Sequence, residues 1–182
     1  TMKEERYADN LRFFRTSEKV FESSEPIYYP DDEVTLRLIS YYPYQEEGVN
    51  MGESTMSVAV ETDQNLSAGY FCSDFLVASQ NLQSAPKGAI ALHYDHKFFK
   101  LKIALVGKEG EELQGILDAD PKLSVCGFYT KAIYDFQKET YSAFSNEKSI
   151  TPAGKWEIQG DPLSGKEVIL IPQETCLLYT SP

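Results

Sequence analysis

Apolar and polar residues alternate in short runs along most of this chain. Residues 34–38 and 56–60 show the pattern most clearly, with valine, leucine or methionine at every second position. Because successive side chains of a strand point to opposite faces, a period of two predicts half-buried β-strands. Further strands are predicted at residues 73–78, 89–98, 99–106, 123–129, 132–136, 156–158 and 168–171. Many short strands about ten residues apart predict an antiparallel sandwich or barrel.

Two segments depart from this pattern. Met2 to Phe21 comes closest to a helical period, but it is short of apolar residues, so we expect an extended arm or a loose helix. Phe144 to Pro152 is rich in polar residues and is the best linker candidate.

The stretch from Leu92 to Leu105 holds the only two histidines of the chain, His93 and His96. In a strand these two side chains point to opposite faces, so they cannot share a metal ion. The apolar neighbours of His96 predict that it is buried and hydrogen-bonded in the core, with His93 in solvent. The apolar phase then shifts after Phe98, which predicts a bulge or a corner.

Composition narrows the function classes. The chain has 182 residues, of which 17 are Lys or Arg and 28 are Asp or Glu, giving a net charge of −11. An acidic chain without a basic patch argues against binding to nucleic acid or to an anionic membrane surface. There is no apolar run long enough for a transmembrane helix, and no secretory signal is present in this chain.

No constellation of residues predicts catalysis. The sequence contains no G-x-S-x-G elbow, no P-loop and no Rossmann glycine pattern, and its carboxylates are scattered. The cluster Asp31, Asp32 and Glu33 has the chemistry of calcium ligands, but a charged turn after Pro30 is the favoured interpretation. We therefore predict no enzyme activity, no cofactor and no metal site.

The three cysteines, Cys72, Cys126 and Cys176, suit neither a disulfide scaffold nor a zinc site, because their number is odd and their spacing is wide. Buried free thiols at Cys72 and Cys126 are the favoured prediction. A Cys72–Cys126 bridge is the alternative in an exported protein.

The aromatic run YYPY spans Tyr41 to Tyr44. Tyr41, Tyr42 and Tyr44 are candidate surface contacts for a sugar, since aromatic rings provide flat binding platforms. The other interpretation, which we favour, is a strand end whose tyrosines pack at the edge of the core.

Four stretches, in this order along the chain, resemble the fimbrillin-like proteins of Bacteroidota, which are subunits and anchors of surface fimbriae. The stretches are residues 27–44, 58–78, 89–105 and 169–173. The residues that match the family's motifs are Tyr41, Tyr42, Pro43 and Tyr44, then Asp63, Gln64, Ser73 and Asp74, and then His96, Lys97, Lys100 and Leu101.

The resemblance implies transthyretin-like β-sandwich domains without catalysis. Residues 1–146 would form a fimbrillin-like N-terminal sandwich, and residues 147–182 a linker and the start of a second β domain. It also implies export as a lipoprotein to the outer membrane and the cell surface. The partners would be other fimbrial subunits, joined by donor-strand exchange in a stalk, tip or anchor. The alternative is a cell-surface module that binds glycans or proteins and does not polymerise.

Both ends of the chain raise further expectations. In part of the family an arginine-specific protease cuts the N-terminal segment, and Arg12 and Arg15 are the best-placed arginines for such a cut. The family's lipid-carrying N-terminal cysteine is missing from this chain. The closing sequence CLLYTSP, residues 176–182, resembles a translated sequencing-adapter tail, so we expect it to be non-native.

Overall fold

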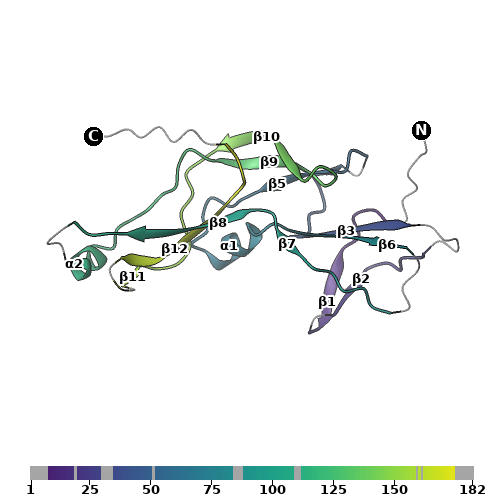
Figure 1. Ribbon diagram of the computed structural model, residues 1–182, viewed down its shortest axis with the longest axis horizontal. Coiled ribbons are helices and arrows are strands. Elements are labelled where there is room, and N and C mark those ends of the chain that lie inside the picture. The colour runs from purple at the N-terminus through teal and green to yellow at the C-terminus, as the bar shows by residue number, and fades with distance from the viewer. Residues whose placement is uncertain are drawn as a thin grey trace.

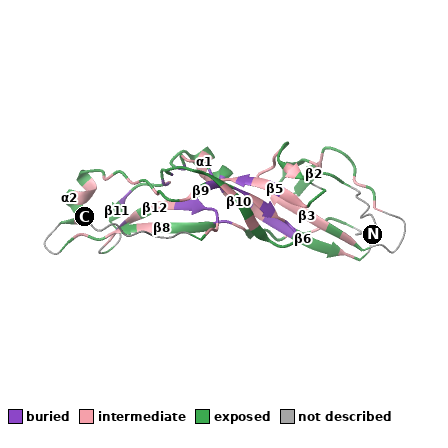
Figure 2. Cartoon of the chain, turned by 90° about the horizontal axis from the view of Figure 1, so that it is seen from above, coloured by how far each residue is buried: buried purple, intermediate pink, exposed green. Residues whose placement is uncertain are grey.

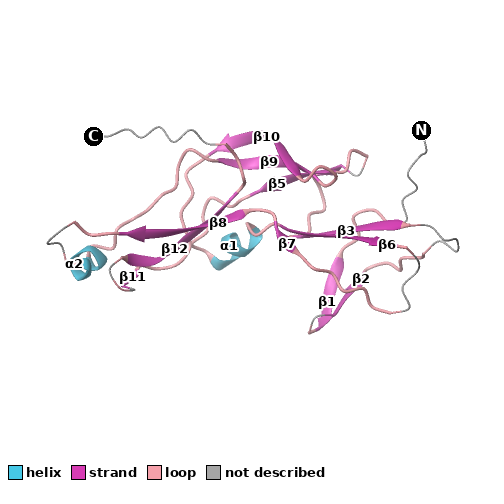
Figure 3. Ribbon diagram, in the orientation of Figure 1, coloured by secondary structure: helices cyan, strands magenta, loops and turns pink. Residues whose placement is uncertain are grey.

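The fold is described by a computed structural model that covers residues 8–18, 20–29, 35–50, 52–83, 88–108, 112–158, 160 and 162–174. Strands dominate these residues and only two short helices occur (Figure 3), which confirms the prediction of an all-β fold. The elements are β1 (Phe13–Ser17), β2 (Val20–Ser23), β3 (Leu36–Tyr42), β4 (Val49–Asn50), β5 (Thr55–Ala59), α1 (Ser67–Cys72), β6 (Leu76–Leu82), β7 (Asp95–His96), β8 (Phe99–Leu105), α2 (Leu113–Asp118), β9 (Tyr129–Asp135), β10 (Thr140–Glu147), β11 (Glu157–Ile158) and β12 (Leu163–Leu170).

The main sheets form two layers. One layer is the sheet β10-β9-β5-β4, and the other contains the sheets β3-β6-β7 and β11-β12-β8. Figure 1 shows β5, β9 and β10 above the layer that contains β3, β6, β8 and β12. All pairs of neighbouring strands are antiparallel. The result is an all-β sandwich, to which β1 and β2 add a separate hairpin.

The core lies between the two layers, because its buried residues come from strands of both. Figure 2 shows that the buried segments gather around the middle of the molecule. Alternate residues of β5 and β9 are buried and their neighbours are not, as the period of two predicted. Strand β12 differs, because the consecutive residues Val168 to Ile171 are all buried. A strand with a run of buried residues is covered on both faces. Ile150 and β12 share one core with β5 and β9, so residues on both sides of position 146 build the same sandwich.

Gln64 attaches the loop before α1 to β12. Its side chain is fully buried, and its amide Nε2 donates to the carbonyl oxygen of Ile169 at 2.8 Å. The amide nitrogen of Ile169 donates in return to Oε1 of Gln64, also at 2.8 Å. The side chain therefore pairs with one residue of β12 as a neighbouring strand would, and satisfies two backbone groups that are buried from water.

Two glycines allow a close crossing of backbones beside β12. Gly154 and Gly165 both have a positive φ, of +85° and +100°. A Cβ atom on Gly154 would fall inside contact distance of the carbonyl oxygen of Gly165. The register between β12 and β8 shifts at this place, between Leu163 and Lys166. Glycine at both positions is therefore a requirement of the bulge in β12.

Several predicted elements are corrected by the structure. In the described part of the segment before the sandwich, β1 and β2 form a hairpin, which is neither the loose helix nor the extended arm that the sequence predicted. The strand predicted at residues 73–78 begins only at Leu76, because α1 ends beside Ser73. Of the strand predicted at residues 89–98, only Asp95–His96 pairs. Residues 144–147 belong to β10 and Ile150 is fully buried, so the predicted linker is part of the sandwich.

Replacing Tyr134 by phenylalanine is expected to stabilise the protein. The hydroxyl of Tyr134 is buried and has no hydrogen-bond partner among the described residues, while its ring packs edge-on against Phe75 and Phe136. Burial also raises the pKa of Tyr134 to about 12. Tyr134→Phe keeps the packing and removes the unsatisfied group, so the free energy of unfolding should rise by about 1 kcal/mol.

The matched control for this change is Tyr141→Phe. The hydroxyl of Tyr141 donates to the carbonyl oxygen of Lys97, so its loss should lower the free energy of unfolding by about 1 kcal/mol. Urea denaturation of the two variants measures both effects. Changes of the same sign in the two variants would contradict the explanation.

Candidate functional site

The two histidines lie at the surface of the protein. His93 and His96 are both exposed, and among the described residues no group of three or more His, Cys, Asp or Glu side chains could hold a metal ion. The Nδ1 atom of His96 lies 2.7 Å from Oδ1 of Asp74. The acidic cluster at residues 31–33 lies outside the described residues.

The prediction of a buried His96 is wrong, because 68% of its side chain is exposed. His96 pairs with Leu76, and Leu76 pairs with Tyr42, so these residues share one face of their sheet. Val77 is buried on the opposite face, which is the one that faces the core. The apolar pattern of the segment therefore pointed to the wrong face. His96 nevertheless has the predicted hydrogen bond, to Asp74 at the surface.

The tyrosines of the YYPY run point in different directions. Tyr41 packs against Phe136, and its hydroxyl donates to the side chain of Asn10. Tyr42, the next residue of β3, is exposed on the other face. Tyr44 lies beyond the strand, with its ring near the guanidinium of Arg12. The three rings therefore do not make one continuous surface.

Arg15 lies in β1 and Arg12 is the residue before β1, at the base of the β1–β2 hairpin. The hairpin is exposed along most of its length. The guanidinium of Arg12 lies 4.9 Å from the centre of the Phe14 ring and 5.4 Å from that of Tyr44. These cation–π contacts hold the base of the hairpin against the YYPY run. The side chain of Arg15 is exposed on β1, and its Nε donates to the carbonyl oxygen of Ser17.

Cys72 and Cys126 are free thiols, as the favoured prediction stated, but their predicted burial is wrong. Cys72 and Cys126 are both exposed and unbridged. Cys72 ends α1, a helix without buried residues, and Cys126 lies in a loop with its Sγ 3.2 Å from the hydroxyl of Ser149. Cys176 lies outside the described residues.

A polar cluster attaches α1 to the sheet that contains β8 and β12. The hydroxyl of Tyr70 donates to Glu167, and the Nζ of Lys100 lies 3.5 Å from the same carboxylate. Burial raises the pKa of Tyr70, and the hydrogen bond with Tyr70 raises the pKa of Lys100. Because each polar group has a partner within the cluster, its role is to position α1.

Strand β8 has an open edge. Among the described residues it pairs with β12 on one side only. Phe99 and Leu101 remain 39% and 41% exposed, whereas their partners on β12, Leu170 and Val168, are fully buried. The same row continues along β8 with Ile103 and Leu105, both half-buried. An apolar row beside an unpaired edge is the strongest candidate for a functional surface among the described residues.

Comparisons with known proteins find a matching family model and solved structures with a similar fold. The fimbrillin-like family model matches residues 1–181. A search of curated proteins finds no match. Among the described residues, no helix is long and apolar enough to cross a membrane.

Two solved structures have a similar fold. A proposed cell adhesion protein from Bacteroides ovatus is 16% identical with a TM-score of 0.59, over 86% of this chain and 57% of that protein. A second one, from Bacteroides uniformis, is 22% identical with a TM-score of 0.54, over 89% of this chain and 60% of that protein. The chain therefore spans less than two thirds of either solved protein.

Proposed function

Because this chain belongs to the fimbrillin-like family, we propose that it is an exported structural protein of a surface fimbria that acts in adhesion. Neighbouring subunits join it by exchange of a β-strand. It has no catalytic role in this proposal, and its partners are other fimbrial subunits. The observation that carries the proposal is the open edge of β8.

The edge of β8 has what strand exchange requires. An unpaired strand edge presents free N–H and C=O groups, which an incoming strand satisfies with its own backbone. The row that begins with Phe99 and Leu101 would pack against the side chains of that strand, and its half-exposed surface would then be removed from water. β8 is seven residues long, so the added strand would span about 23 Å.

Replacing Leu101 by aspartate is expected to abolish assembly through this edge. A carboxylate in the middle of the apolar row would be buried without a partner by an incoming strand, which costs several kcal/mol. In the free subunit Leu101 is already 41% exposed, so the fold should survive. Electron microscopy and size-exclusion chromatography of the full-length, processed protein should show at least a tenfold loss of oligomers.

The control for this change is Lys102→Gln, one residue further along β8 on the opposite face of the sheet. It should leave the oligomers unchanged. Oligomers at the wild-type level in Leu101→Asp would exclude the β8 edge as the assembly site. A processed wild-type protein that stays strictly monomeric would exclude assembly by strand exchange, and an adhesive role without polymerisation would then replace it.

Proteolytic maturation in the hairpin also belongs to this proposal. We favour Arg15 over Arg12 as the cut site: both arginines are exposed, but the guanidinium of Arg12 packs against two aromatic rings. With an arginine-specific protease, Arg15→Lys should abolish the cut in the hairpin, as read by mass spectrometry. Arg12→Lys is the control, and the protease should still cut this variant in the hairpin. The reverse outcome would assign the cut to Arg12.

A further inference from the structure

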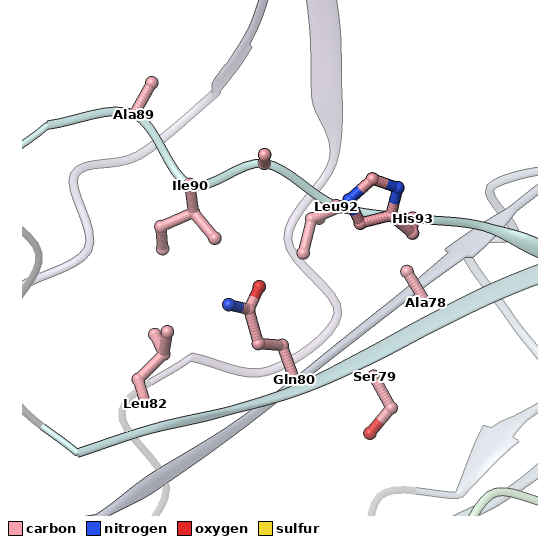
Figure 4. Close-up of a pocket in the computed structure, with 9 residues that line it drawn as sticks. Ala78, Ser79, Gln80, Leu82, Ala89, Ile90, Leu92 and His93 are labelled. Atoms are coloured by element: carbon pink, nitrogen blue, oxygen red, sulfur yellow. The ribbon is translucent and has the colours of Figure 1, made fainter.

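The segment of residues 88–94 runs beside β6 without pairing to it. The pairing of β6 with β7 includes Val77 opposite Asp95 and goes no further. Beyond that pair a space of about 480 Å³ separates the two stretches of chain (Figure 4). Its lining is Ala78, Ser79, Gln80 and Leu82 from β6, and Ala89, Ile90, Ala91, Leu92 and His93 from the segment.

The segment is already in register with β6. In the observed register, Leu76 pairs with His96 and Val77 with Asp95. The next pair in the same register would be Ala78 with Tyr94. On its other side, Ala78 pairs with Ser40 of β3. The hydroxyl oxygens of Tyr94 and Ser40 lie 2.6 Å apart, across β6. Tyr94 therefore holds the position that a continued strand would give it.

The side chains of the segment also have the alternation of a strand. Ile90 and Leu92 are half-buried, whereas Ala91 and His93 are exposed. Figure 4 shows Ile90 and Leu92 pointing toward β6, and Gln80 of β6 pointing toward them. Continued pairing would place Leu92 opposite Gln80, so the residues that line the space are those that would meet in a closed ladder.

The edge of β6 has backbone groups available for this pairing. The amide of Lys97 donates to the carbonyl oxygen of Phe75, so Phe75 points its backbone groups toward this side. In an antiparallel ladder every second residue does the same, which assigns Val77, Ser79 and Asn81 to this edge. Among the described residues, no strand pairs with Ser79 or Asn81 on that side.

We propose that residues 89–94 form a closing strand that alternates between the open position seen here and a closed position, paired with β6 in the register of β7. In the closed position Ser79 pairs with His93 and Asn81 with Ala91. Closing removes the 480 Å³ space and gives the backbone groups of Ser79 and Asn81 partners. Opening leaves the edge of β6 unpaired. This switch is independent of the assembly proposed at β8, which lies in a different sheet.

A disulfide tests whether the closed position occurs. In the closed ladder, residues 80 and 92 would lie directly opposite each other, at a position where the two residues exchange no backbone hydrogen bonds. Their Cα atoms would be about 4.5 Å apart, which is within disulfide range. We therefore replace both by cysteine, as Gln80→Cys with Leu92→Cys. In a chain with Cys72, Cys126 and Cys176 replaced by serine, this pair should cross-link at least tenfold faster than Gln80→Cys with Ala91→Cys. The observed pair Leu76–His96, as cysteines, is the positive control. Equal rates for the first two pairs would overturn the proposal.

Hydrogen exchange tests the same switch without cysteines. His93→Pro removes the amide that pairs with Ser79 in the closed ladder, whereas in the open position that amide has no hydrogen bond to any described residue. The amides of Ser79 and Asn81 should exchange at least tenfold faster in His93→Pro than in the wild type or in His93→Ala. The exchange rate of the Lys97 amide, which donates to the carbonyl oxygen of Phe75, should be unchanged. This amide shows whether β7 is still paired with β6. Unchanged exchange at Ser79 and Asn81 in His93→Pro would overturn the closing strand.

Discussion

Replacing Gly154 by alanine is expected to destabilise the protein by about 3 kcal/mol or more. Its φ of +85° costs an alanine about 1–2 kcal/mol, because the Cβ atom is too close to its own backbone. The same Cβ would also overlap the carbonyl oxygen of Gly165. Separating the two backbones disturbs the bulge in β12, and such overpacking costs about 1–3 kcal/mol.

Gly127 provides a matched control for this prediction. Its φ is +80°, but nothing lies within 4 Å of the position that a Cβ would take. Gly127→Ala should therefore show the backbone cost alone, about 1–2 kcal/mol. The free energies of unfolding come from urea denaturation of both variants. Equal losses would show that the close crossing at Gly154 contributes nothing beyond its backbone conformation.

Replacing Gln64 by alanine is expected to have an effect of similar size. The change leaves the amide and the carbonyl of Ile169 buried without their partners, and each such group costs about 1–3 kcal/mol. A total loss of about 3 kcal/mol corresponds to a fall in melting temperature of about 6–12 °C for a chain of this size. Gln137→Ala, which removes an exposed amide bonded to Ser54, is the control and should change the melting temperature by less than about 2 °C.

Gln64→Glu separates the hydrogen bonds of Gln64 from its packing. A glutamate keeps the size and still accepts from the amide of Ile169, but as a carboxylate it cannot donate to the carbonyl oxygen. Burial should raise the pKa of this glutamate in the folded state, so the carboxyl is protonated and able to donate at low pH. The loss of stability of Gln64→Glu relative to the wild type should therefore be smaller at pH 4 than at pH 7. Thermal melts at the two pH values measure this, and an equal deficit at both would contradict the paired-amide role.

The all-β fold could be predicted from the sequence because alternating apolar and polar residues identify a strand and its buried side chains. In β5 and β9 the apolar residues at every second position are the buried ones. The run Val168 to Ile171 likewise predicted a strand, and the structure adds that it is covered on both faces. Helix α1 had no comparable signal, since it is six residues long, has no buried residue and has no side-chain cap.

The candidate site was harder to predict because it depends on which strands are neighbours. The shift of phase after Phe98 correctly marked the start of β8, but sequence does not show that β8 lies at an edge. His96 was misplaced for the same reason, since an apolar pattern does not identify which face of a sheet is covered. The contact between Arg12 and Tyr44 joins residues far apart in the chain, and neither residue type alone predicts it.

The place of β12 along the chain has a consequence for the order of folding. It is the last described strand in sequence, yet it supplies the centre of its sheet and three consecutive residues of the core, Val168 to Leu170. As the chain emerges from the ribosome, β8 has no partner on either side until residues 163–170 have been synthesised. The sandwich therefore closes late, through pairings between distant segments, which are slow to form. Between the synthesis of β8 and that of β12, the nascent chain carries an apolar strand with two open edges, and it depends on its surroundings to keep that strand from aggregating.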